Sequence, residues 1–361
     1  MRRTEGTFGS KIFRLIALLI ILLILFVAIA LALLTMTEFN PKEEETVLVR
    51  GEGSYSIRSS DEIRIVTWNI GYGGLGEEED FFMDGGKGVN PKSEEEVKAN
   101  IDEIIMSIQS MRADILLLQE VDINSSRSFH MDQTKMITNA FPNYASTFSY
   151  NHKVPYIPYP WPPMGKVGAG LLTVSGYPIK SSTRIQLPSP FSWPIRVVNL
   201  KRCVTVHRME LGWTDKELVV MNLHLEAYDD GEGKRNQTKA LMALLDEEMA
   251  KGNYVIAGGD FNQVFSNVDW SDYPAQKDKW QPEEIEVSDF NRAWQFVMDP
   301  EVPTCRSLSQ PLKGANKTTF QYYMLDGFVL SSNITVIEAK TQDLGFVNTD
   351  HNPVVLRIKL K

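Results

Sequence analysis

The chain has 361 residues, a formal net charge of −9 and two cysteines. The acidic balance disfavours a protein that coats nucleic acid through a basic surface, but it does not exclude an enzyme that binds phosphate through cations. Cys203 and Cys305 form no metal motif and no disulfide framework, and their spacing leaves open whether they form one bridge.

The first predicted element is a transmembrane helix over residues 15–36. Residues 15–34 are all apolar and uncharged, and a helix of this length spans about 30 Å, enough to cross a bilayer. Basic residues precede the stretch and acidic residues follow it. The positive-inside rule therefore predicts a single-pass protein with residues 1–14 in the cytoplasm and the bulk outside. A cleaved signal peptide is the alternative, although its apolar core usually has only about 7–15 residues.

The rest of the chain predicts one large α/β domain. Residues 37–60 are polar and rich in Glu, Gly and Ser, which indicates a linker, and residues 61–361 would form the domain. Helices are expected after a capping box at Ser93, around residues 241–245 with an end near Gly252, and over 289–298. Interleaved helices and strands indicate layered sheets with helices outside. Strand-like runs lie at 63–70, 114–121, 169–175, 198–211, 217–226, 253–261, 323–331 and 353–360.

Polar residues recur at the ends of these apolar runs. One Asp or Asn at a strand end is usually a turn residue, but a buried polar side chain is costly unless it is paired or bound. The recurrence therefore indicates one shared polar cluster. "GGDFN" at 258–262 is its most specific part, because two glycines permit tight turning and close approach to a ligand. The cluster would contain Asn69, Glu120, Asn222, His224, Asp260, Asn262, Asp326, Asp350 and His351.

Oxygen donors dominate this set, which favours Mg²⁺, with Mn²⁺ or Ca²⁺ as alternatives, over Zn²⁺. His224 and His351 are then not needed as metal ligands and are available for proton transfer. A histidine oriented by a carboxylate can take a proton from water, while a metal neutralises a phosphate. His207 is expected to face solvent from a strand, and His130 and His152 have no evident role. These parts would suffice to hydrolyse a phosphate ester.

At this point the sequence resembles the endonuclease/exonuclease/phosphatase superfamily, the deoxyribonuclease-I-like proteins. The matching pieces are "TWNI", "LLLQEV", "NLHLE", "GGDFN", "LDGFVLS" and "TDHNPV", in the family's order over residues 63–360. The resemblance implies a four-layer α/β/β/α sandwich and a metal-dependent phosphoric ester hydrolase. It also implies that Asn69 and Glu120 are metal ligands, with Asp350 close to the same ion.

Five further roles follow from the resemblance. His351 would be the general base or would orient the water, with Asp326 as its carboxylate partner. Asp260 and Asn262 would orient the nucleophile and bind the phosphate. His224 would contact the phosphate and protonate the leaving group.

The substrate is less defined. "NLHLEAYDDG", followed by Arg235 and Gln237, is similar to a segment of neutral sphingomyelinases and related phosphodiesterases. A membrane anchor also fits a phospholipid substrate. DNA or RNA is the alternative substrate, and a non-catalytic tethered binding module is the alternative class, although that class predicts missing polar residues and none is missing. The protein is expected to be monomeric.

Three segments are candidates for specificity. Residues 150–168 and 187–196 place aromatics among prolines, which keep such segments out of a sheet interior. They are expected as loops that stack on a base, hold a choline group, enter the membrane interface or simply pack. Residues 71–93 are expected to form a mobile rim or an insertion.

Overall fold

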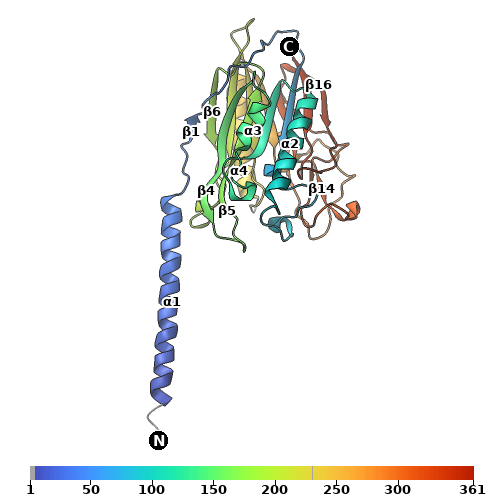
Figure 1. Cartoon of the computed structure of the whole chain (residues 1–361). Coiled ribbons are helices and arrows are strands. Elements are labelled where there is room, and N and C mark those ends of the chain that lie inside the picture. The colour runs from blue at the N-terminus through green and yellow to red at the C-terminus, as the bar shows by residue number, and fades with distance from the viewer. Residues whose placement is uncertain (1–4, 230) are drawn as a thin grey trace.

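In residues 5–229 and 231–361, which the computed structural model describes, two mixed β-sheets pack face to face (Figure 1). The seven-stranded sheet contains, in spatial order, β1 (Glu44–Thr46), β6 (Ser181–Gln186), β7 (Cys203–Glu210), β8 (Glu217–His224), β9 (Tyr254–Asp260), β15 (Asp326–Ser331) and β12 (Trp294–Val297). The six-stranded sheet contains β16 (Ile334–Thr341), β17 (Val354–Leu360), β2 (Ile63–Asn69), β3 (Ile115–Asp122), β5 (Gly165–Ser175) and β4 (Ala145–Ile157). Two strand pairs lie outside these sheets: β10 (Gln263–Phe265) with β11 (Glu283–Ile285), and β13 (Cys305–Arg306) with β14 (Tyr322–Tyr323).

The main core lies between the two sheets. Alternate residues of each strand point to this side, because side chains alternate along extended chain. In β17 the predicted alternation is confirmed: Val354, Leu356, Ile358 and Leu360 are buried in this core. They pack with residues of the facing sheet such as Phe328. The predicted face of the last strand therefore joins the two sheets.

Helices cover the outer faces of both sheets. α2 (Glu94–Met111) and α3 (Gln133–Asn139) pack on the six-stranded sheet, and α4 (Glu232–Ala250) packs on the seven-stranded sheet. The Ser93 hydroxyl accepts a hydrogen bond of 3.1 Å from the backbone N–H of Glu96, as the capping box predicts. The predicted α/β class is confirmed, with the packing order helix, sheet, sheet, helix.

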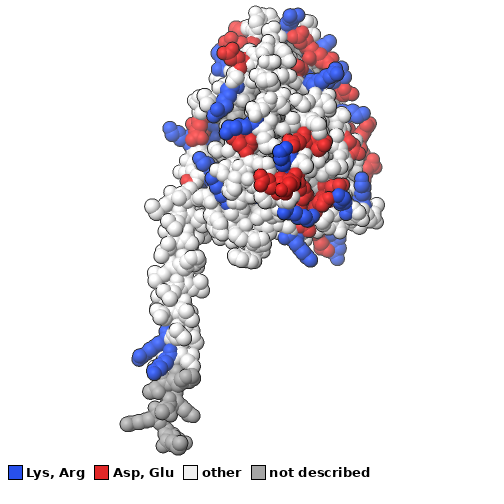
Figure 2. Space-filling model, viewed as in Figure 1, with Lys and Arg blue, Asp and Glu red and all other residues white. Residues whose placement is uncertain are grey.

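α1 (Glu5–Met36) stands apart from the domain (Figure 1). The most apolar stretch of 18 residues within Gly9–Met36 has a mean hydropathy of 3.5 and is not buried. Figure 2 shows it largely free of charged atoms, whereas the domain surface is dotted with both signs of charge. Its length and composition fit a membrane span, and an N-terminal signal sequence would meet the same test.

The structure differs from the prediction in two segments, residues 289–298 and 150–168. The expected helix over 289–298 is wrong, because the chain there forms the short 3₁₀-helix η5 (Val287–Asp289) and then β12, whose backbone pairs with β15. Residues 150–168 are not one loop, since β4 continues to Ile157 and β5 begins at Gly165. β4 tolerates Pro155 because it is an edge strand with a register irregularity between Val154 and Ile157.

Other expectations also change in the folded chain. The strand expected over 198–211 begins only at Cys203. His207 is wholly buried rather than solvent-facing: Nε2 lies 2.7 Å from the Thr147 hydroxyl and Nδ1 lies 2.9 Å from the Val220 carbonyl. Residues 37–60 run along the domain, where β1 pairs with β6. Both cysteines are free, so no bridge joins them.

Candidate active site

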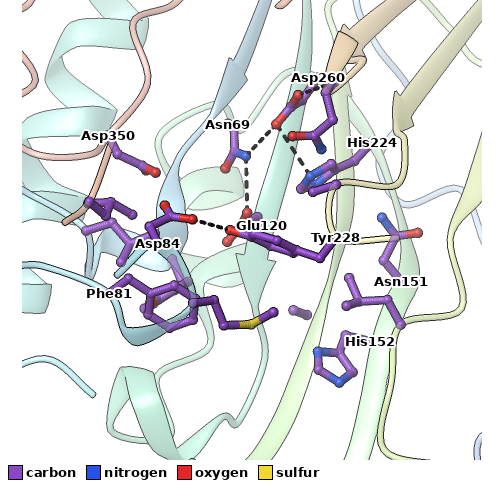
Figure 3. Close-up of a pocket in the computed structure, with 18 of the residues that line it drawn as sticks. Asn69, Phe81, Asp84, Glu120, Asn151, His152, His224, Tyr228, Asp260 and Asp350 are labelled. Atoms are coloured by element: carbon purple, nitrogen blue, oxygen red, sulfur yellow. Dashed lines mark hydrogen bonds and ion pairs between the residues drawn. The ribbon is translucent and has the colours of Figure 1, made fainter. Parts of the chain in front are cut away.

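The polar strand ends meet at one end of the two-sheet core. β2 pairs in parallel with β3, and β8 pairs in parallel with β9, so their carboxyl ends lie together. His224 is the pairing partner of Asp260, and Asp260 in turn lies opposite Asp326 in the antiparallel β15. A cavity of about 420 Å³ opens at this end, and most of the predicted site residues line it (Figure 3).

Asp260 is the central carboxylate of the site. Its Oδ2 accepts a hydrogen bond of 3.0 Å from Asn69 Nδ2, and it lies 3.4 Å from His224 Nε2 and 3.7 Å from His351 Nε2. Figure 3 shows the Asn69 and His224 contacts as dashed lines. Burial raises the pKa of the Asp260 carboxyl to about 6, and the charge of nearby Asp326 adds to this effect. The carboxylate is therefore stabilised only where cations and donors surround it.

His351 lies between two aspartates. Its Nδ1 is 2.8 Å from Oδ2 of the buried Asp326, and its Nε2 faces Asp260. Burial alone would lower the pKa of His351, but Cys305, Asp326 and the hydrogen bond to Asp326 outweigh it and raise the pKa well above its ordinary value. Asp326 thus fixes the tautomer and orientation of the ring and leaves Nε2 at the cavity.

Three oxygen-bearing side chains form the neighbouring part of the site. Asn69 Nδ2 donates to Glu120 Oε1 over 3.2 Å, and Asp350 lines the same cavity. Glu120 has a φ of +55° within a bulge of β3, a conformation that is strained for a residue with a β-carbon. Burial raises the pKa of Asp350 to about 7, partly offset by His351. Glu120 and Asp350 line one cavity and the charge of Glu120 raises the pKa of Asp350, and carboxylates placed in this way fit a divalent cation.

Asp350 and His351 serve different partners although they are adjacent. The Asp350 Oδ1 accepts a 3.2 Å hydrogen bond from the Thr349 hydroxyl, whereas His351 pairs with Asp326. Both side chains still reach one cavity, because they precede β17 rather than alternate along it. The Trp68 indole N–H donates to the His351 carbonyl over 2.9 Å and holds this backbone in place.

The "GGDFN" stretch is explained partly by packing. Gly258 and Gly259 lie inside β9, where an added β-carbon would come within 2.5 Å of the Phe328 ring and 2.0 Å of the Leu223 carbonyl oxygen. The glycines therefore permit close strand and ring packing rather than contact with a ligand. Asn262, at a φ of +50°, donates from its backbone N–H to Asp260 Oδ1 over 2.9 Å. Asparagine tolerates this left-handed conformation, so it can close the turn.

Asn222 does not reach the cavity, which corrects its assignment to the cluster. It is buried between the sheets. Its Oδ1 accepts a hydrogen bond of 2.9 Å from Gln119 Nε2, and its Nδ2 donates one of 3.1 Å to the Thr173 hydroxyl. A residue two positions before His224 points to the same face, but one layer deeper in the core. Asn222 therefore joins the sheets behind the site.

Sequence patterns missed several cavity residues. Arg202 is buried in the lining, and its Nε and Nη1 have no hydrogen-bond partner among the described residues. Its guanidinium lies 3.8 Å from Glu226. His152, assigned no role, also lines the cavity, and burial lowers its pKa to about 4. No motif flags these residues, because they come from strand edges and connections rather than from the ends of apolar runs.

Residues 71–93 form one wall of the cavity. η2 (Phe82–Asp84) places Phe82, Met83 and Asp84 at the mouth, where the Tyr228 hydroxyl donates to Asp84 Oδ1 over 2.9 Å (Figure 3). Arg306 Nη2 bonds the carbonyls of Leu75 and Gly76 at 3.2 and 2.8 Å. The segment is therefore anchored to the domain.

These strand-end carboxylates and histidines, on two packed mixed sheets, define a metal-dependent phosphoester hydrolase. Residues 66–276 match the model of the Endonuclease/Exonuclease/phosphatase family. The chain therefore belongs to this family, as the motifs predict, and it is a hydrolase of the phosphoesterase and nuclease class. A search of curated protein sequences finds no match.

Solved structures share the fold. An endonuclease/exonuclease/phosphatase from Beutenbergia cavernae is 15% identical, with 83% of this chain and 72% of that chain covered and a TM-score of 0.54. The human Nocturnin catalytic domain, solved with bound sulfate, is 18% identical over 87% of this chain and 98% of its own, with a TM-score of 0.51. D. rerio TDP2, solved with a single-strand DNA product, is 11% identical over 83% of this chain and 100% of its own, with a TM-score of 0.52.

Proposed function

We propose that this hydrolase is a membrane-anchored, Mg²⁺-dependent phosphodiesterase whose substrate is a phospholipid head group. The observation that carries the proposal is the geometry around Asp260, where one carboxylate oxygen faces His224, His351 and Asn69. An acid, two imidazoles and an amide surround a space that suits a phosphate and an attacking water. The domain would comprise residues 61–361, behind the transmembrane helix at 15–36 and the linker at 37–60.

The residues present fit the proposed cation. Asn69, Glu120 and Asp350 offer oxygen donors, and Mg²⁺ prefers one or two carboxylates with the remaining positions left to water and substrate phosphate. Burial raises the pKa of Asp350 because His351 and Arg306 offset the loss of water only in part, so a bound cation would stabilise its charge further. When bound, the ion would neutralise the phosphate charge and stabilise the leaving oxygen. Mn²⁺ and Ca²⁺ share the same ligand preference.

His351 is the proposed base. Asp326 holds Nδ1, and in the neutral ring Nε2 would take a proton from a water that Asp260, 3.7 Å from Nε2, orients. The raised pKa of His351 favours the protonated ring that this step produces. Asn262 fixes the second Asp260 oxygen through its backbone N–H, and its own side chain is assigned to the phosphate. These groups would act on the attacking side of the phosphorus.

His224 is proposed to bind the phosphate and to protonate the leaving oxygen. Burial and the nearby charge of Arg202 lower its pKa well below the ordinary value, so the free enzyme holds a neutral ring. A phosphate anion beside the ring would favour the protonated form. Arg202 lines the same cavity and supplies a cation whose Nε and Nη1 form no hydrogen bond with the residues that the structure describes.

A phospholipid is favoured over nucleic acid by the cavity and the apolar helix. The mouth carries Phe82, Met83, Tyr159 and Phe191 beside the polar centre, a lining suited to a substrate with an apolar part. Nucleic acid remains the second candidate, since TDP2 was solved with a single-strand DNA product and Tyr228 or Trp280 in the lining could stack on a base.

A substrate panel tests the proposal. The full chain in detergent micelles would be assayed with a phosphocholine lipid, single-stranded DNA, RNA and an aryl phosphodiester, each with Mg²⁺, Mn²⁺ or Ca²⁺. Lipid hydrolysis that exceeds nucleic-acid cleavage supports the proposal, and the reverse order selects the nuclease. Activity that persists in EDTA would contradict the metal requirement. The monomeric state is proposed as well, and light scattering on the same sample measures it.

A further inference from the structure

The tip of the β4–β5 hairpin and the neighbouring loop carry exposed aromatic and apolar side chains. Trp161 is 89% exposed, Trp193 is 53% exposed and Ile195 is 58% exposed, with Tyr156 and Tyr159 exposed beside them. We call these five residues the aromatic rim. Prolines at 158, 160, 162, 163 and 194 restrict the backbone around them. Large exposed apolar groups on a restrained tip indicate a binding surface.

The aromatic rim is fastened to the domain end of α1. The Trp193 indole N–H donates to the Thr35 hydroxyl in the last turn of α1 over 3.1 Å. Just beyond the helix, Glu38 Oε1 lies 2.8 Å from the buried Lys201 Nζ and 3.3 Å from Arg196 Nε. Figure 1 shows β4 and β5 at the end of the domain where α1 leaves it. The aromatic rim is therefore held at the level where the apolar helix ends.

The aromatic rim also borders the active-site cavity. Tyr159 lines the cavity, and its ring packs edge-on against Phe82 with centroids 6.2 Å apart. Phe82 and Met83 continue the lining toward the polar centre. Figure 2 shows a surface largely free of charged atoms where α1 meets the domain. The aromatic rim, which contacts the end of α1 through Trp193, thus also reaches the cavity lining through Tyr159.

We propose that the aromatic rim inserts into the head-group region of the leaflet from which α1 emerges, so that the cavity mouth faces the lipid surface. Trp and Tyr favour this interface because their rings are apolar and their N–H or O–H groups remain hydrated. The substrate is then a phosphoester within a lipid head group whose acyl chains stay in the bilayer. This inference rests on the proposed anchoring and phosphodiesterase activity.

Fluorescence quenching tests the insertion without using activity. The full chain would be placed in nanodiscs made with or without brominated lipids. Trp213 is the matched control: it follows β7, which runs about 25 Å from its start near Lys201 to Glu210, and it is 38% exposed. The double variant Trp161→Phe/Trp193→Phe is expected to remove most of the bromine-dependent quenching, because both tryptophans belong to the aromatic rim, and Trp213→Phe is expected to remove none. Equal quenching in the two variants, or none in the parent chain, overturns the proposal.

Activity then tests the orientation of the mouth. Trp161→Ser and Ile195→Ser are expected to lower kcat/KM for a lipid in nanodiscs about five- to tenfold, with less than about a twofold change on a soluble aryl phosphodiester. Trp213→Ser should change neither. Equal losses on both substrates would overturn the proposed orientation. If neither substrate is cleaved, the proposed function fails, while the quenching result still decides whether the aromatic rim inserts.

Discussion

The His351 imidazole donates through Nδ1 to Oδ2 of Asp326 over 2.8 Å, although 24 residues lie between them in the sequence. Asp326 begins β15, whose partner β9 ends at Asp260. The two aspartates therefore flank one ring from a single strand pair. The geometry of these three side chains is held by the sheet backbone, because each of them lies at the end of a strand or directly before the start of a strand.

Replacing His351 by Ala is expected to lower kcat on an aryl phosphodiester by about 10²–10⁴-fold, because the water then lacks a base. Asp326→Asn should lower kcat by about 10–100-fold, since the ring remains but loses its orienting carboxylate. Steady-state kinetics on the full chain measures both. Thermal unfolding provides the fold control, and a folded His351→Ala enzyme with parent activity would contradict the role.

Mg²⁺ is expected to stabilise the folded chain. At a concentration 100 times its Kd, the ion should raise the free energy of unfolding by about 2.7 kcal/mol, because it binds only the folded site. Glu120→Gln should remove most of this gain at the same Mg²⁺ concentration. Asp215→Asn is the control, since Asp215 is exposed in a distant turn. Equal stabilisation of both variants would place the ion elsewhere.

Arg202→Met is expected to raise KM about 10–100-fold, because a charge-assisted hydrogen bond to the substrate anion contributes about 1.5–3 kcal/mol. The free energy of unfolding should also fall, by about 3–5 kcal/mol, because the substitution leaves the buried Glu226 carboxylate without the cation that lies 3.8 Å away. Initial rates and denaturant unfolding measure the two effects. An unchanged KM would assign Arg202 to structure alone.

Glu248 provides a pH-dependent contribution to stability away from the active site. Burial opposes its ionisation, but hydrogen bonds from Arg208, Lys251 and Asn253 lower its pKa from 4.5 to about 2. Because the folded pKa is below the unfolded one, the contribution is complete above pH 4.5 and is lost as the pH falls toward 2. Glu248→Gln should therefore lower the free energy of unfolding by about 1–3 kcal/mol at pH 7.

The difference between Glu248→Gln and the parent chain should shrink as the pH falls from 4.5 to 2. Denaturant unfolding across this range measures it. Glu247→Gln is the matched control on the same helix, because Glu247 is exposed and pairs only with Lys251 among the ion pairs of the described residues. A difference that is independent of pH would show that packing, not charge, accounts for the effect.

The proposed topology predicts that protease added to intact cells releases the domain. Residues 1–14 carry the basic charges, so the positive-inside rule places the domain outside. Immunoblots with antibodies against the domain, with a cytoplasmic protein as the control for lysis, measure its release. If the domain persists on intact cells and is cleaved only after lysis, the predicted orientation is wrong.

Strong local signals are determined by the sequence alone. The apolar run before residue 36, the alternation in β17 and the capped start of α2 each depend on neighbouring residues, so their elements could be predicted. The recurrence of polar residues at strand ends likewise predicted a shared site, because buried polar groups need partners. The chain order of six short motifs then indicated the family that the comparison shows.

The tertiary structure decided what depends on distant partners. Asn222 and His224 have the same strand parity, but only His224 reaches the cavity, because depth along β8 is set by the facing sheet. Residues 294–297 became a strand because β15 offered an unpaired backbone edge. The roles proposed for Arg202 and the aromatic rim follow only from their positions, beside the cavity and beside the end of α1. No local sequence pattern encodes what packs against them.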